Sequence, residues 1–214
     1  MEKERYFAKS FEEDFILKTL KGKRKVNFQS IDNIIKTKTI KPNTKSFGRE
    51  RRLSCSFLHK NYLKTYRPHG LIFQTEAKPN YILPFDIVLL GATDNIIVHY
   101  YRIKNNLYIY YNHKLIDGFN RFIFKDFNKM IEKIYSPSFA WKRVNEFRKA
   151  HGYKYLPYSK YRLVEYNEVV FHKKIKIKPI AIFGYRKNAY EISKKYGLPH
   201  FISAKRFFDR ENKK

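Results

Sequence analysis

The middle of the chain shows short apolar runs with the composition of β-strands. These runs are rich in Ile, Val, Tyr and Phe, and Pro, Gly, Asn and Asp separate them. Such alternation is typical of strands joined by turns. The pattern predicts strands within residues 70–73, 81–90, 95–103 and 106–112.

The second half of the chain mixes helices with further strands. Ser136 as cap, Pro137 at the first helical position and Gly152 as the stop predict a helix between them. Residue spacing predicts the remaining elements in the same way: helices at 125–134 and 186–197, the latter closed by Gly197, strands at 162–171 and 175–183, and a last segment at 200–208. Because strands and helices do not alternate regularly, we expect an α+β fold with a mixed sheet core and peripheral helices.

The first fifty residues have a different character. Ser10 and Glu13 have the spacing of a capping box, which predicts a short helix through residues 11–20. A second amphipathic stretch lies around Ile31 to Ile35, and the polar, basic residues 36–52 predict an exposed loop. We therefore expect a basic N-terminal helical and loop arm at 1–50 and a catalytic α+β domain at 51–214.

Charge is the feature of the composition that changes this picture most. The chain has 46 Lys and Arg against 19 Asp and Glu, a formal net charge of +27. This excess of positive charge opposes folding by self-repulsion and favours a polyanionic partner. Nucleic acid is the first candidate for that partner, and an anionic membrane surface is the alternative. In the arm, phosphate contacts are expected from Lys41, Lys45, Arg49, Arg51 and Arg52, although a merely solvated loop is the alternative.

Aromatic content supports nucleic acid only in part. The 18 Tyr and 19 Phe could stack on bases beside the cations, but an AT-rich genome also encodes such a composition by default. No apolar run approaches the ~20 residues of a membrane span, and the N-terminus has no apolar signal-peptide core, so we expect a cytoplasmic protein. The single cysteine, Cys55, predicts a small packed residue and no CxxC zinc site.

Glu168 stands out among the scarce carboxylates. Strand alternation places it on one face of residues 162–171 with Val164, Tyr166 and Val170, and places Glu165 and Asn167 on the other. A carboxylate between β-branched neighbours on a central strand is costly unless it is paired or catalytic. Either a functional carboxylate or an ion pair on an exposed face agrees with this pattern.

The segment from Tyr166 to Phe208 resembles the C-terminal part of the DarT-type ADP-ribosyltransferase toxins, which modify bases in DNA. The resemblance rests on "EVV" from Glu168, a basic turn, the strand Ile177 to Phe183, a helix, and the aromatic pair Phe207 and Phe208. It implies an ADP-ribosyltransferase-like fold, NAD as a substrate, and Glu168 as the catalytic carboxylate. It also implies DNA or RNA as a partner and an antitoxin or another acidic protein as a further one.

The upstream segment "LHKNYLKTYRPHGLIF" resembles the first strand and helix of that family. By this resemblance His59 would bind NAD and Asn61 would begin the helix, with Gly70 and Leu71 following; the family's second His is absent. The catalytic Arg would be Arg67, with Arg102 in reserve. Either Tyr66 or Tyr166 would stack on nicotinamide, and "TYRPHG", with His69, is either a functional loop or a strand-entry turn.

Three other functions remain open on the sequence. Asp86 and Lys104 have the arrangement of a PD-(D/E)XK nuclease, but Arg102 stands where an acid is expected, so Glu76 or Glu168 would have to replace it. Arg52 and His59 have the Arg-x₆-His spacing of HEPN ribonucleases, in a strand-rich region. A non-enzymatic DNA- or RNA-binding protein is the third alternative. A P-loop or HExxH motif is absent from the sequence.

Overall fold

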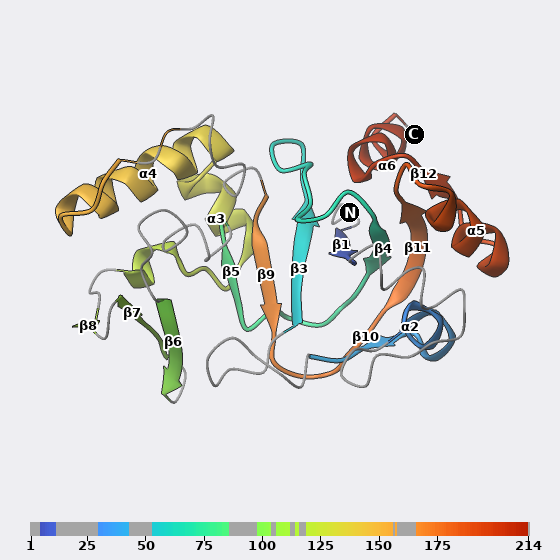
Figure 1. Ribbon diagram of the computed structural model, residues 1–214, viewed down its shortest axis with the longest axis horizontal. Coiled ribbons are helices and arrows are strands. Elements are labelled where there is room, and N and C mark those ends of the chain that lie inside the picture. Colours follow the sequence, from blue (N-terminus) through green and yellow to red (C-terminus); the bar gives the residue numbers. More distant parts are fainter. Residues whose placement is uncertain are drawn as a thin grey trace.

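The computed structural model of the protein describes most of the chain (Figure 1). The described residues are 5–11, 30–42, 53–85, 98–103, 106–111, 114–115, 119–155, 157 and 166–213. Within them the fold is α+β, as the sequence predicted.

A seven-stranded sheet forms the centre of the fold, in the order β12-β11-β4-β1-β3-β9-β5. Neighbouring strands run antiparallel except β11 and β12, which are parallel, so the sheet is mixed. Its strands are β1 (Tyr6–Ser10), β3 (Leu53–Leu58), β4 (Gly70–Gln74), β5 (Tyr81–Leu83), β9 (Glu168–Phe171), β11 (Lys178–Phe183) and β12 (His200–Phe201).

Two small sheets accompany the central one. The first pairs β2 (Thr39–Ile40) with β10 (Ile175–Lys176). The second contains β6 (Val98–Ile103), β7 (Asn106–Tyr111) and β8 (Lys114–Leu115).

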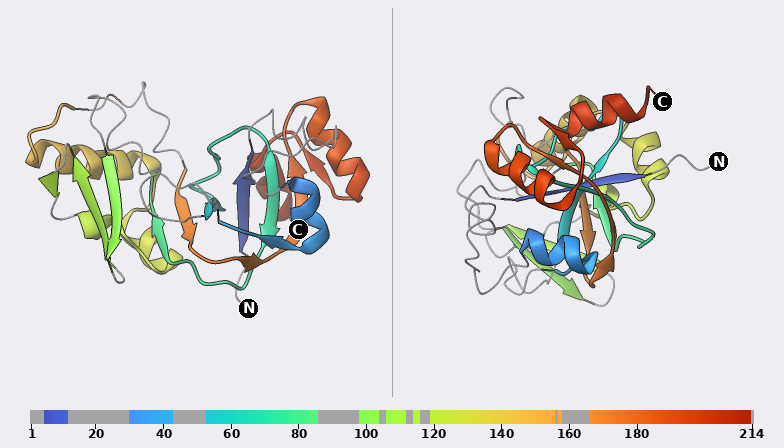
Figure 2. Two further views of the ribbon diagram at one scale, coloured as in Figure 1. Left: turned by 60° about the horizontal axis from the view of Figure 1, so that its bottom comes forward. Right: turned by 90° about the vertical axis from the view of Figure 1, so that its right-hand side faces the viewer.

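Helices cover both ends of the central sheet (Figures 1 and 2). The described helical segments are α2 (Ile31–Thr37), the 3₁₀ helix η2 (Phe119–Phe122), α3 (Phe127–Lys133), α4 (Pro137–Ala150), α5 (Lys187–Tyr196) and α6 (Ala204–Glu211). In Figure 1, α3 and α4 lie at the end near β5, and α5 and α6 lie at the end near β11.

Side-chain capping begins most of these helices. The side chains of Ser30, Asp126, Ser136 and Ser203 each accept a hydrogen bond from a backbone N–H in the first turn of their helix. Pro137 follows its cap at the first helical position, and Gly152 just beyond α4 has a φ of +74°. Gly197 ends α5 with a φ of +62°. The predicted helices at 125–134, 136–152 and 186–197 are confirmed.

Strand alternation divides the core into two faces. Phe7 pairs in register with Phe57 on one side and Phe73 on the other, and the three rings share one face with Phe127 of α3. On the opposite face, Ala8, Ile72 and Ala181 pack with Ala204 and Phe207 of α6. The central sheet, which carries Glu168 on β9, is therefore packed on both faces.

The structure corrects several sequence predictions. The N-terminal strand β1 was not predicted, yet it lies between β3 and β4 in the central sheet. The loop predicted at 36–52 is wrong at its start, because α2 extends to Thr37 and β2 pairs with β10. Residues 175–183 form two strands in different sheets instead of one, and the last segment contains α6 after the two-residue strand β12. The helix expected at 11–20 lies, beyond Phe11, outside the described residues.

Strand pairing over long sequence separation explains these differences. Residues 6–10 pair with partners roughly fifty to seventy positions away, and a five-residue run gives no periodic signal strong enough to reveal them. Because β1 contributes Phe7 and Ala8 to the core, the described start of the expected arm belongs to the same sheet as β3, β4 and β9.

Candidate functional site

Glu168 begins a strand in the interior of the sheet. β9 lies between β3 and β5, and Glu168 pairs in register with Leu83. Its side chain is only 3% exposed. The Ser54 hydroxyl donates a hydrogen bond of 2.6 Å to Glu168 Oε1. The exposed ion pair considered for Glu168 on the sequence is therefore wrong, because the carboxylate is buried.

Ser54 and Glu168 meet because of the strand register. Ser54 pairs with Val170 across β3 and β9, so Ser54, Val170 and Glu168 point to the same face of the sheet. The hydroxyl then reaches the carboxylate diagonally, at the short distance expected for a charge-assisted hydrogen bond. Two residues 114 positions apart thereby form one polar unit.

Lys9 adds a cation to this part of the sheet. Its Nζ donates a hydrogen bond of 2.8 Å to the backbone oxygen of Ser54. Burial raises the pKa of the Cys55 thiol from 9.0 to about 12, while the Lys9 ammonium acts against this rise and the Glu168 carboxylate adds to it. Lys9 and Glu168 therefore both lie close enough to Cys55 to influence its charge.

Neither Lys9 nor Ser54 was predicted from the sequence to belong to the site. A signal for Ser54 was present, because Ser54 and Ser56 alternate with apolar residues in "LSCSFL" and so share one strand face. Lys9 offered no comparable signal, because its strand was not predicted. The small, buried role expected for Cys55 agrees with its 4% exposure.

Tyr66, Tyr166 and Arg67 form a second contact group. The rings of Tyr66 and Tyr166 meet edge to face with centroids 5.8 Å apart. The Arg67 guanidinium lies over the Tyr66 ring at 4.7 Å. Tyr166 is buried and precedes Glu168 by two residues, whereas Tyr66 and Arg67 are exposed. The structure thus joins two aromatic candidates with the candidate Arg beside the chain segment that leads to Glu168.

Asn167 anchors that segment to β3. Its side-chain amide donates to the Phe57 oxygen at 2.8 Å and accepts from the Phe57 N–H at 2.7 Å. The side chain is fully buried. Asn167 therefore replaces a missing pair of backbone hydrogen bonds and fixes where β9 begins.

His59 and Asn61 belong to a turn that contacts the segment between α3 and α4. His59 and Tyr62 exchange backbone hydrogen bonds, and the Asn61 side chain donates to the Tyr135 oxygen at 2.5 Å. The His59 ring stacks near Phe57, with centroids 6.2 Å apart. These contacts account for both side chains structurally, and the NAD-binding roles implied by the resemblance stay predictions.

His69 and Gly70 lie at the start of β4. A Cβ on Gly70 would come within 2.1 Å of the Lys9 oxygen, so this position requires glycine. His69 is buried, its backbone oxygen accepts from the Phe11 N–H, and it packs against Gly184. The geometry agrees with the strand-entry turn that the sequence analysis considered for "TYRPHG".

Several other candidates are placed only in part. Lys41 is exposed after β2, while Lys45, Arg49, Arg51 and Arg52 lie outside the described residues. Asp86, Lys104 and Glu165 also lie outside them, and only the backbone of Arg102 is described, in β6. The nuclease alternatives therefore stay predictions.

Comparisons with known proteins provide no family for this chain. No family model matches it, and no curated protein or solved structure matches at a significant level.

The described residues contain neither a helix that could span a membrane nor a cluster of metal ligands. None of the helices within the described ranges is both long and apolar enough to span a membrane. Among the same residues, no three His, Cys, Asp or Glu side chains gather closely enough to hold a metal ion.

Proposed function

We propose that this protein transfers ADP-ribose from NAD to a base of DNA or RNA, with Glu168 as the catalytic carboxylate. The observation that carries the proposal is the hydrogen bond of 2.6 Å from Ser54 to Glu168 within the sheet. It supports a carboxylate held in one orientation by a partner on the neighbouring strand. Preorganised charge of this kind is the main resource by which enzymes stabilise a charged transition state.

The proposed step needs one negative charge beside the ribose. The bond between the ribose C1 atom and the nicotinamide nitrogen breaks, and its electron pair leaves with nicotinamide. The ribose then carries an oxocarbenium-like positive charge, which Glu168 stabilises as carboxylates do in glycoside hydrolysis. A nitrogen or oxygen atom of the base forms the new bond to C1, and the proton it loses passes to Glu168 and then to water.

The nicotinamide and diphosphate groups of NAD could be bound by the side chains of Tyr66, Tyr166 and Arg67. An aromatic face can stack on nicotinamide, and a guanidinium forms a planar fork for a diphosphate. Tyr66 and Arg67 are exposed and joined to the buried Tyr166, two residues before Glu168. Lys9, hydrogen-bonded to the backbone of Ser54, is a second cation near the carboxylate.

The net charge supports nucleic acid as the acceptor. A charge of +27 attracts phosphates over long distances and releases counterions on binding. The neutral or anionic small acceptors of other transferases would not require such an excess of cations.

The test is to incubate the protein with NAD and oligonucleotides of both sugar types and to measure oligonucleotide mass. The proposal predicts a product heavier by one ADP-ribose, release of nicotinamide, and no effect of a metal chelator. Oligonucleotides that are shortened only when Mg²⁺ is present would contradict it and favour the nuclease built on Asp86 and Lys104.

A non-enzymatic nucleic-acid-binding protein is the second candidate function. The burial of Glu168 favours this function. A carboxylate that is 3% exposed and hydrogen-bonded to Ser54 has the partner that a buried polar group needs, so its role can be purely structural. This candidate predicts tight binding of oligonucleotides with no consumption of NAD, so the same incubation separates the two functions.

A further inference from the structure

The C-terminal unit of the fold, residues 184–213, carries an excess of positive charge. Between residues 184 and 213 the chain carries eight Lys and Arg but three Asp and Glu. All eight cationic side chains are exposed. This part follows β11 and contains α5, β12 and α6, which lie together at one end of the molecule (Figure 2).

The two helices of this unit pack on opposite faces of the sheet. Ala189 and Ile192 of α5 belong to the core cluster that contains Ile182, whereas Phe207 of α6 packs with Ala181 and Phe183. Successive residues of β11 point to opposite faces, so the two helices cover different sides. Each helix therefore keeps one face in the core and presents the other to solvent.

The solvent face of α5 combines tyrosine with basic side chains. Lys187, Tyr190 and Lys194 are spaced by three and four residues and so lie on one side of the helix. The preceding turn adds Tyr185, with the Arg186 guanidinium over its ring at 5.3 Å. We name these five residues, Tyr185, Arg186, Lys187, Tyr190 and Lys194, the α5 strip.

Both tyrosines of the α5 strip are largely exposed to solvent. Tyr185 is 63% exposed and Tyr190 is 55% exposed, and nearby Ile202 is 57% exposed. The edge of the Tyr190 ring contacts His200, whose Nε2 lies 2.8 Å from the Gly184 oxygen. One side of the Tyr190 ring is thus supported while more than half of the residue faces water.

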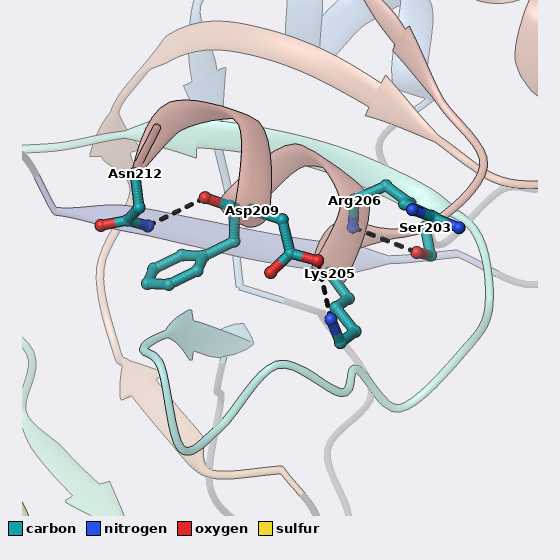
Figure 3. Close-up of polar contacts among 6 residues, drawn as sticks. Ser203, Lys205, Arg206, Asp209 and Asn212 are labelled. Atoms are coloured by element: carbon teal, nitrogen blue, oxygen red, sulfur yellow. Dashed lines mark hydrogen bonds and ion pairs between the residues drawn. The ribbon is translucent and has the colours of Figure 1, made fainter. Parts of the chain in front are cut away.

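Two of the three acids of this unit form ion pairs, one of them with Lys187 of the α5 strip. Lys187 lies 3.8 Å from Glu191, and Lys205 pairs with Asp209 at 2.7 Å on α6. Figure 3 shows the Arg206 side chain extending away from that pair, while its backbone N–H bonds to Ser203. The unit therefore keeps a surplus of positive charge for a partner.

We propose that the α5 strip binds single-stranded nucleic acid, a surface that rests on the proposed function because it would hold the acceptor strand. The exposed tyrosines stack on bases, and the neighbouring cations contact phosphates, which is the combination that single-stranded nucleic acid requires. A second copy of this chain is disfavoured on the same surface, because it would bring the same excess of positive charge.

The test measures binding of the full-length protein by fluorescence anisotropy to oligothymidylate and oligouridylate of about twenty nucleotides. The Tyr185→Ala/Tyr190→Ala double variant is expected to bind both about a hundredfold more weakly, because it loses two base stacks and each is worth about tenfold. The matched control is Tyr135→Ala/Tyr155→Ala, which removes two tyrosines that are 56% and 63% exposed near α4. It should bind like the wild type.

A second pair of variants tests the cations. Arg186→Gln/Lys194→Gln should reduce the slope of log affinity against log salt by about 1.4, since a single strand contributes about 0.7 for each phosphate contact. Lys142→Gln/Lys149→Gln on α4 is the matched control and should leave the slope unchanged. Wild-type binding by all strip variants would overturn the α5 strip while leaving ADP-ribose transfer possible. Conversely, loss of binding in these variants from a protein that never consumes NAD would support the strip and reject the proposed activity.

Discussion

The burial of Glu168 in the sheet reduces the number of roles that this residue can have. As one of few acids in a basic chain it had two interpretations, and the exposed one is excluded by its burial. Its contact with Ser54 leaves the catalytic and the structural interpretations, which differ in what loss of charge would do.

Glu168→Gln separates these interpretations. Gln keeps the volume and can still accept the Ser54 hydrogen bond, so the protein should fold, but the charge facing the ribose cation is lost. We expect NAD turnover onto oligonucleotide to fall by ~10²–10³. Glu146→Gln on α4, where Glu146 forms an exposed pair with Arg143, is the control and should stay within a few-fold. Full activity in a folded Glu168→Gln protein would remove the carboxylate from the mechanism.

The Cys55 thiol predicts a specific loss of stability in alkali. Burial raises its pKa to about 12 in the folded protein, against 9.0 for the ordinary thiol. Below pH 9 both states hold the proton, whereas between pH 9 and 12 only the unfolded thiol ionises, so the folded state loses stability as pH rises. At a pH of about 10.5 the loss from this group is about 2 kcal/mol.

Urea unfolding of wild type and Cys55→Ala at several pH values measures this contribution. Ionisation of other side chains affects both proteins alike, so the difference in their pH dependence isolates the thiol. The wild type should lose more stability than Cys55→Ala above a pH of about 9. Parallel curves for the two proteins would show that the thiol does not titrate as its burial requires.

At the scale of elements, close packing between β1 and β4 depends on a glycine. Gly70 pairs with Ser10, and a Cβ there would lie 2.1 Å from the Lys9 oxygen. The clash is with backbone, so neighbouring side chains cannot relieve it by moving. Both strands lie in the interior of the central sheet, and β1 carries Lys9.

Gly70→Ala should therefore cost about 3 kcal/mol or more of unfolding free energy, at the upper end of overpacking costs. Gly152→Ala is the matched control, because nothing lies within 4 Å of its added Cβ and only its φ of +74° is strained. That strain costs about 1 kcal/mol. Chemical denaturation of both variants measures the difference, and equal costs would show that β1 and β4 are less closely paired than described.

At the scale of the whole molecule, charge dominates the expected behaviour. With a net charge of +27, binding of an oligonucleotide should depend steeply on salt. If about four phosphates are contacted, affinity should fall about fiftyfold between roughly 50 and 200 mM salt. Anisotropy titrations over this range measure the slope, and a flat response would contradict phosphate contact.

The basic segment that begins in the last turn of α2 is tested in the same titrations. Replacing Lys36, Lys41 and Lys45 with Gln should lower the salt slope by about 2 if this segment contacts a single strand. Lys36 and Lys41 are exposed, and Lys38 is left unchanged because it ends α2 in the left-handed conformation. An unchanged slope would show that the segment is a solvated loop.

Local chemistry in the sequence determined several helices and the general class of the fold. Ser136, Pro137, Gly152 and Gly197 act within a few residues of their own positions, so α4 and α5 could be predicted closely. The strand predicted at 70–73 from its apolar run corresponds to β4, and the small packed role predicted for Cys55 agrees with its burial.

Only the tertiary structure decided how distant segments meet. The place of β1 between β3 and β4, the division of residues 175–183 between two sheets, and the Ser54–Glu168 hydrogen bond all depend on strand register. Register is set by the packing of whole faces, since a shift of one residue would exchange the buried and opposite faces of a strand. The sequence therefore indicated that Glu168 is a candidate carboxylate. Its hydrogen-bond partner Ser54, 114 positions away, could be identified only from the strand pairing.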